Sequence, residues 1–165
     1  MPVFSVLHIA LLAGLVGGLW VSPSPAGERL SGPVGARVLR VLDGDTLEVS
    51  AHIWLGQDVA TRVRLSGIDA PELRGACSYE RELAVRARAY LLARLGSSPD
   101  FPSDSGDGRR VRVSLYDISL GKYGGRVLAR VLTENGEDLG RSLLAAGLAR
   151  PYAGGRRRAW CGAAG

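Results

Sequence analysis

Alternating hydrophobic and polar positions predict a run of strands in the first half of the chain. Valine and leucine dominate residues 34–42, and residues 46–55 carry β-branched and aromatic side chains. The following segment, "VATRVRLSGI" (residues 59–68), alternates valine and leucine with arginine. Period-two patterns of this kind are typical of half-buried strands. We expect three consecutive antiparallel strands.

The pattern changes to a helical period in "CSYERELAVRARAYLLARLG" (residues 77–96). Leu83, Ala87 and Leu91 recur at the spacing that places them on one helix face. Ser78 is the predicted N-cap, and Gly96 is placed to end the helix. This segment therefore predicts an amphipathic helix with one buried face.

After a loop-like stretch at residues 96–108, apolar alternation returns at residues 111–115 and 126–132. A short helix is predicted over residues 139–146. Five strands with a helix between the third and fourth, and a short helix after the fifth, indicate an α+β protein. This order is that of a five-stranded Greek-key barrel, the OB-fold, which binds oligonucleotides on one face.

The N-terminal 26 residues contain no Asp, Glu, Lys or Arg and are almost wholly apolar from Val3 to Val21. Small residues at Ser24 and Ala26 stand at signal-peptidase spacing. We expect a secretory signal cleaved after Ala26, or an uncleaved anchor that attaches the protein to the membrane through residues 3–21. Either reading places the protein outside the cytosol, as a secreted or periplasmic protein or as an outward-facing anchored one.

The remaining chain divides by composition into a linker at residues 27–33, a domain at residues 34–155 and a basic tail at residues 156–165. The formal net charge is +5, and Lys122 is the only lysine among 21 Lys and Arg residues. Arginine pairs bidentately with phosphate, so this surplus favours a polyanionic partner.

Two cysteines are present, Cys77 and Cys161. In an oxidising compartment an even number favours a disulfide, which would stabilise the fold by roughly 4 kcal/mol for a loop of this length. The alternative is two unrelated thiols.

Acidic residues cluster in two short segments. "DGDT" contains Asp43 and Asp45, and "RLSGIDAPE" contains Asp69. A D-G pair alone usually marks only a tight turn. If the third strand lies beside the first, Asp45 and Asp69 can approach each other, and two close carboxylates need a positive charge between them. All-oxygen ligands favour a hard cation such as calcium or magnesium.

Three further residues could act on a phosphate. Glu72 is placed to act as a base for water, while Arg64 and Arg126 could neutralise charge that develops on the phosphoryl group. Each has a simpler alternative: an Arg64–Asp69 surface salt bridge, a Glu72 carboxylate that accepts a backbone hydrogen bond, and an Arg126 paired with Asp117.

Taken together and in this order, "DGDT", R-x4-D-x-P-E and "KYGGR-x-LA" resemble the staphylococcal nuclease family of secreted, calcium-dependent OB-fold phosphodiesterases. The resemblance covers Val34 to Tyr152. It implies that Asp45 and Asp69 bind one Ca²⁺ ion, with the backbone carbonyl of Ala70 as a further ligand. Asp43 matches a position that supports the calcium site.

The resemblance also implies roles for residues around the metal. Glu72 matches the family's general base or water-orienting carboxylate, and Arg64 and Arg126 match its phosphate-contacting arginines. Tyr123 and Tyr152 correspond loosely to tyrosines near the nucleotide pocket, where a ring could stack on a base. Core or rim packing is the alternative for both tyrosines.

The sequence departs from the family pattern at three places. Gly121 replaces an acidic residue, Gly125 is an additional glycine, and the family's long final helix is reduced to "GGRRRAW". A Cys77–Cys161 bridge would tie down this C-terminal stub. These departures bear on substrate affinity more than on the metal site.

The expected function is a monomeric hydrolase, an endonuclease that cleaves DNA and RNA with low sequence specificity and favours single strands. The family resemblance implies that it leaves 3′-phosphate ends. The alternative is a non-catalytic nucleic-acid-binding OB-fold module. A third reading, in which the basic tail contacts anionic lipid or polysaccharide, depends on Arg156, Arg157, Arg158 and the apolar N-terminus alone.

Overall fold

The computed structural model describes residues 27–96, 111–122 and 124–162. The predicted signal or anchor segment, most of the predicted loop at residues 96–108, and Tyr123 lie outside these ranges. Within them, no helix combines the length and hydrophobicity that crossing a membrane requires. The predicted division into signal, linker, domain and tail stays a prediction.

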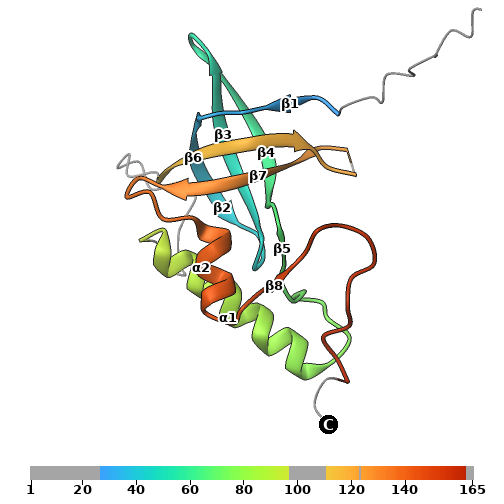
Figure 1. The fold of residues 1–165 in the computed structure, drawn as a ribbon. Helices are drawn as coiled ribbons and strands as arrows, with labels where there is room; N and C mark the ends of the chain where they lie inside the picture. Colours follow the sequence, from blue (N-terminus) through green and yellow to red (C-terminus); the bar gives the residue numbers. More distant parts are fainter. Residues whose placement is uncertain (1–26, 97–110, 123, 163–165) are drawn as a thin grey trace, which may run out of the picture.

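A closed, five-stranded barrel forms the upper layer of the molecule (Figure 1). The strands follow the order β6-β2-β3-β4-β7, and pairing of β6 with β7 closes the barrel. All neighbours are antiparallel except β4 and β7, which run parallel. This arrangement confirms the predicted α+β barrel. The strands are β2 (Val34–Val41), β3 (Thr46–Trp54), β4 (Gln57–Leu65), β6 (Arg112–Leu120) and β7 (Arg126–Thr133).

Three two-residue strands add to this barrel. β1 (Arg29–Leu30) pairs with β6 and lies inside the stretch predicted as a linker. β5 (Ile68–Asp69) pairs antiparallel with β8 (Arg150–Pro151) in a separate small sheet. The β5–β8 pairing joins the acidic segment after β4 to the C-terminal part of the chain.

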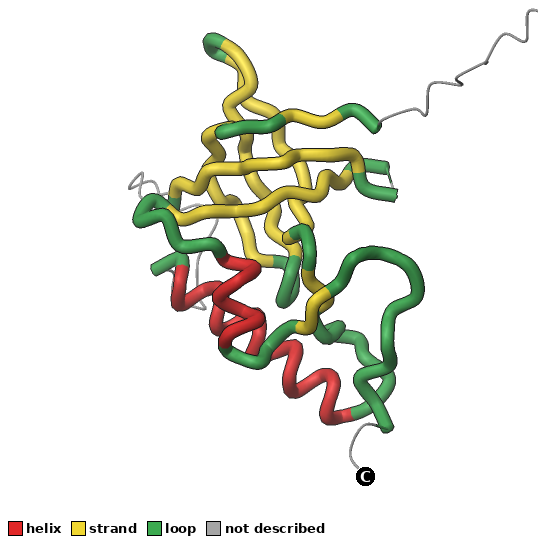
Figure 2. The backbone as a smooth tube through the Cα atoms, viewed as in Figure 1, coloured by secondary structure: helices red, strands yellow, loops and turns green. Residues whose placement is uncertain are grey.

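Two helices, α1 (Ser78–Arg94) and α2 (Leu139–Ala145), lie together below the barrel (Figure 2). The prediction of Ser78 as the N-cap is wrong, because Ser78 is already helical. Cys77 is the N-cap, with extended backbone angles, and its carbonyl accepts a hydrogen bond from the Arg81 amide. At the other end Gly96 has a φ of +65°, a conformation that glycine adopts without steric cost.

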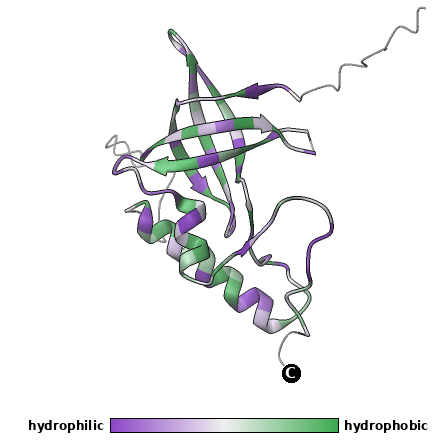
Figure 3. Ribbon diagram, viewed as in Figure 1, coloured by the Kyte–Doolittle hydropathy of each residue, from purple (hydrophilic) through white to green (hydrophobic). Residues whose placement is uncertain are grey.

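The core lies inside the barrel and between the barrel and the helices. Leu47, Val63 and Leu115 are buried in the barrel, and the predicted helix face of Leu83, Ala87 and Leu91 is buried as well. Figure 3 shows green, hydrophobic residues along the barrel strands and on both helices. The packed core therefore fixes the ends of β3 and β4, where the acidic residues lie.

Candidate active site

The ends of β3 and β4 bring the two acidic segments together. Asp45 directly precedes β3, whose first residue, Thr46, pairs with Arg64 near the end of β4. The amide of Leu65 donates to the carbonyl of Asp45 at 2.8 Å. The expectation that β4 lies beside the first barrel strand is wrong, because β3 separates β2 from β4. It is the β3–β4 register that places Asp45 against Arg64.

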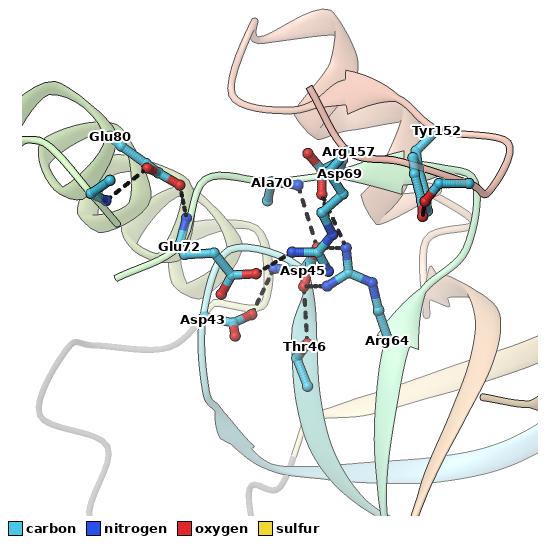
Figure 4. Close-up of polar contacts among 12 residues, drawn as sticks. Asp43, Asp45, Thr46, Arg64, Asp69, Ala70, Glu72, Glu80, Tyr152 and Arg157 are labelled. Atoms are coloured by element: carbon cyan, nitrogen blue, oxygen red, sulfur yellow. Dashed lines mark hydrogen bonds and ion pairs between the residues drawn. The ribbon is translucent and has the colours of Figure 1, made fainter. Parts of the chain in front are cut away.

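Asp45 is 2% exposed, and its carboxylate accepts hydrogen bonds from Arg64, Thr46 and Ala70 (Figure 4). Arg64 Nη1 lies 2.6 Å from Oδ1, and Arg64 Nη2 lies 2.6 Å from Oδ2. The hydroxyl of Thr46 donates to Oδ1 at 2.9 Å, and the amide of Ala70 donates to Oδ2 at 3.3 Å. The carboxylate therefore does more than form a turn, because it joins the start of β3 to β4 and to the residue that follows β5.

Asp43 holds the backbone of this turn, because its Oδ1 accepts from the Asp45 amide at 3.1 Å. Burial raises the pKa of Asp45 from 3.8 to about 7, and the negative charge of Asp43 adds to the shift while Arg64 opposes it. A carboxyl in this environment is stabilised as an anion when a further positive charge arrives.

Asp69, in β5, completes a pair of buried carboxylates. Its Oδ1 lies 3.5 Å from Arg64 Nη2, so one guanidinium contacts Asp45 and Asp69 together. Arg64 is itself 5% exposed, which makes this a buried cluster and not a surface salt bridge. The structure therefore brings together Asp45, Asp69 and Arg64 as the sequence predicted.

Glu72 follows on the loop between β5 and α1, with its side chain 47% exposed. The loop is held by Glu80, which is buried in the first turn of α1. The Glu72 amide donates to Glu80 Oε1 at 3.4 Å, and the Ala76 amide donates to Oε2 at 3.0 Å. The Glu72 carboxylate is thus accessible to solvent and points toward the same cluster, while its backbone is held by Glu80 (Figure 4).

Arg126 begins β7 directly after Gly125, which has a φ of +75°. The parallel register places Arg126 beside Arg62, and Arg62 is on the same face of β4 as Arg64. Despite the additional glycine, Arg126 therefore lies on the strand next to the one that carries Arg64. The predicted alternative partner, Asp117, accepts a hydrogen bond from Arg130 at 3.1 Å.

Tyr152 lies just after β8, on the opposite side of the cluster from Glu72 (Figure 4). Its amide donates to the carbonyl of Gly67 at 2.9 Å, and its hydroxyl donates to that of Gly155 at 2.8 Å. It lines a cavity of about 230 Å³ that also includes Asp69. Tyr152 and Asp69 therefore line the same cavity.

A residue that the sequence did not single out as part of the site is Arg157. Its Nε lies 3.1 Å from Asp69 Oδ1, and its Nη1 donates to Glu72 Oε1. The run of three arginines was visible in the sequence, but its position over the acids was not. The position of Arg157 results from the Cys77–Cys161 disulfide, which the structure contains. The two Cα atoms of this disulfide are 6.0 Å apart.

The donor chemistry of the cluster fits a hard divalent cation. Asp45 and Asp69 offer carboxylate oxygens that lie close together. A positive charge, the guanidinium of Arg64, already contacts both carboxylates. Among the described residues, Cys77, Glu80 and Cys161 also bring three metal-ligating groups within 4.8 Å. That second group does not fit a metal site, because disulfide sulfurs are not thiolate ligands.

The molecule is a small barrel. Two buried carboxylates, a buried arginine and further, more exposed arginines lie at one end of it. In a comparison with protein families, residues 62–159 match the family described as staphylococcal nuclease homologue. The match covers more than half of the chain, and the chain belongs to this family. A comparison with curated proteins gave no match.

Members of the family are generally metal-dependent nucleases. The matched range contains Arg64, Asp69, Glu72 and Arg126, while Asp43 and Asp45 precede it. The domain is accordingly a nuclease-like or nucleic-acid-binding module.

Proposed function

We propose that this protein is an extracytoplasmic, calcium-dependent endonuclease that hydrolyses phosphodiester bonds of DNA and RNA with low sequence specificity. One observation carries the proposal: two buried carboxylates, Asp45 and Asp69, share the guanidinium of Arg64. Glu72, an exposed carboxylate, lies across Arg157 from Asp69. The residues that we propose as metal ligands, as the base and as the phosphate-binding arginine therefore lie close together.

In this proposal Asp45 and Asp69 hold the cation, with the Ala70 carbonyl as a further ligand and Asp43 fixing the turn. The bound cation supplies positive charge to the phosphoryl oxygens and lowers the pKa of water. Glu72 accepts the proton of the attacking water, whose oxygen bonds to phosphorus as the bond to the 5′ oxygen breaks. The products are a 3′-phosphate and, once the leaving oxygen takes a proton, a 5′-hydroxyl.

The arginines act on the substrate. Arg64 is held between the two aspartates, and Arg126 is on the neighbouring strand. Both carry permanent charge and can neutralise the negative charge that develops on the phosphate in the transition state. Tyr152 offers a ring for an unpaired base, which favours single-stranded substrates.

A non-catalytic nucleic-acid-binding module is the second candidate, and a specific observation favours it. Arg64 contacts both oxygens of Asp45, and Arg157 contacts both Asp69 and Glu72. The carboxylates therefore have positive partners without a metal ion. A domain that kept these ion pairs permanently would bind nucleic acid through its basic surface and leave it intact.

Glu72→Gln separates the two candidates. For a nuclease, this variant should lose activity by roughly 10²–10⁴-fold, because the proton acceptor is removed, while calorimetry with CaCl₂ shows binding as in the wild type. Glu82→Gln, at an exposed position on α1, is the matched control and should retain activity. Equal turnover in the two variants would remove Glu72 from the mechanism.

The disulfide supports a location outside the cytosol, because such bonds persist in oxidising compartments. Attachment to the membrane through residues 3–21, a monomeric state and a preference for single strands are parts of the same proposal. The lipid-binding reading of the arginine run loses support, because Arg157 is engaged at the acidic cluster.

A further inference from the structure

Residues 152–162, which we call the strap, cross the site and are fixed at their start. The preceding strand, β8, pairs with β5, so that Arg150 lies opposite Asp69. The guanidinium of Arg150 lies 3.6 Å from the ring centroid of Trp160 and donates to the carbonyl of Ala159 at 3.0 Å. Trp160 is 7% exposed. These contacts fold the far end of the strap back toward β8.

The strap is also fixed at its far end. Cys161 is bonded to Cys77, the residue that precedes α1. Figure 1 shows the strap as the red loop that leaves β8, curves outward and returns to the start of α1. The arginines at 156–158 are thereby confined to a loop beside the site, where Figure 3 shows a purple, hydrophilic stretch.

Arg157 is the strap residue that reaches the acids. Its Nε and Nη1 bond to Asp69 and Glu72 respectively, and its side chain remains 39% exposed. Although burial acts to lower it, the hydrogen bond to Glu72 and the charge of Asp69 leave the pKa of Arg157 raised. Arg157 is therefore a permanent cation that contacts both the site and the solvent.

The surrounding space fits a phosphate backbone. Asp69, Glu72 and all three strap arginines line one cavity of about 630 Å³. A divalent cation held by Asp69 would repel a guanidinium that is bonded to the same carboxylate. A phosphodiester bound there supplies a new negative partner, so that Arg157, whose side chain is 39% exposed, can leave the carboxylates and keep its charge paired.

We propose that Arg157 is a third phosphate-contacting arginine of the site, positioned by the disulfide-anchored strap, and that it exchanges its carboxylate partners for a substrate phosphate. The proposal rests on the proposed function, because it assumes that nucleic acid and a divalent cation bind at this cluster. It adds a substrate-binding residue that lies outside the strands of the barrel. It also gives the disulfide a role beyond stability.

The test compares wild type with Arg157→Gln. Affinity for a fluorescein-labelled single-stranded oligonucleotide should fall by about tenfold or more, since a hydrogen-bonded charge contact is lost. The slope of log affinity against log salt should become shallower by about 0.7. Calorimetry with CaCl₂ alone should show tighter calcium binding, because a competing cation has been removed from Asp69. Arg157→Lys should recover part of the oligonucleotide affinity.

Arg141→Gln removes the same charge from an exposed position on α2 and is the matched control. An equal loss of affinity in both variants, or no change in either calcium or oligonucleotide binding, overturns the proposal. Failure of the proposed function can be distinguished from failure of the proposed role of Arg157. A wild type that binds the oligonucleotide but never cleaves it would contradict the nuclease activity. The affinities of the variants would still decide the role of Arg157.

Positioning by the strap is tested by combining Arg157→Gln with Cys77→Ser/Cys161→Ser. If the disulfide acts through Arg157, the cysteine variant alone weakens oligonucleotide binding, and adding Arg157→Gln causes little further loss. Before affinities are compared, intact mass confirms the composition of each variant, and a thermal melt shows that it is folded. Losses that simply add would show that the disulfide does not position Arg157.

Discussion

Both carboxylate oxygens of Asp45 lie 2.6 Å from nitrogens of Arg64, in a pair that is almost fully buried. The partners are 19 residues apart in sequence and meet because β3 and β4 pair in register. The guanidinium of Arg64 therefore contacts the carboxylate that we propose as a metal ligand. This pair connects the stability of the fold to the chemistry of the site.

Removing one partner of this pair should destabilise the protein strongly. Asp45→Ala leaves the charge of Arg64 buried without its main hydrogen-bond partner, so we expect the free energy of unfolding at about pH 4, where Asp45 contributes most, to fall by about 3–5 kcal/mol. Chemical denaturation in the absence of calcium measures this change. A loss below about 1 kcal/mol would contradict the buried pair. Asp45→Asn preserves the volume and is the better variant for activity measurements.

Stability without calcium should depend on pH in an unusual direction for a carboxylate. The pKa of Asp45 is raised in the folded protein, from 3.8 to about 7, so the folded state binds this proton more tightly than the unfolded state. The contribution of Asp45 to stability is therefore greatest below about pH 4 and is lost as the pH rises to about 7. Comparison of wild type and Asp45→Asn across this range isolates the effect.

Calcium affinity should also depend on the ionisation of Asp45, but it should increase as the pH rises. Binding requires the ionised carboxylate, so the calcium dissociation constant should rise by up to about tenfold per unit of pH below 7 and level off above it. Asp43→Asn should shift this transition to lower pH, because the charge of Asp43 raises the pKa of Asp45. A pH-independent affinity between 5 and 8 would contradict the assignment of Asp45 as a ligand.

Glu80 should affect catalysis without touching substrate. It holds the amides of Glu72 and Ala76, and a Cβ at Gly75 would lie 2.4 Å from its side chain, which shows how closely the loop packs on it. We expect Glu80→Ala to lower kcat by roughly 10–100-fold through displacement of Glu72, with calcium affinity nearly unchanged. Initial-rate kinetics beside Glu82→Ala test this, and equal kcat values in the two variants would rule it out.

The disulfide closes a long loop, because its cysteines are 84 positions apart in the sequence. Cys77→Ser/Cys161→Ser should lower the free energy of unfolding by roughly 4 kcal/mol through the greater freedom of the unfolded chain. Urea denaturation of the oxidised wild type and the variant gives the difference. Equal midpoints would mean that the strap contributes nothing to global stability.

The sequence predicted the barrel because each strand carries its own alternation and the inserted helix its own period. The carboxylates and Arg64 could be found because they stand in short motifs with fixed spacing. Arg157 could not be placed, since its position depends on a disulfide and on Trp160 packing against Arg150. Local patterns also said nothing of β5 and β8, whose two-residue pairing is created by tertiary structure.

The pairing of β2 with β3 and of β3 with β4 was predicted from the sequence, but the reason why the acidic segments meet was not. The convergence of Asp45 and Asp69 was predicted for a wrong reason, adjacency of the first and third strands. It results instead from the turn after β4, which returns Asp69 to Arg64. Tyr123 and the predicted signal segment lie outside the described residues and stay predictions.

The most direct measurement of the proposed function is cleavage of a labelled single-stranded DNA by the purified protein, with calcium and with excess chelator, beside Asp45→Asn. We predict cleavage with calcium, none with chelator, and a loss of about 10²-fold or more in the variant, because the metal ligand is gone. Oligonucleotide binding by the folded wild type without cleavage at any calcium concentration would contradict the nuclease and favour the binding module.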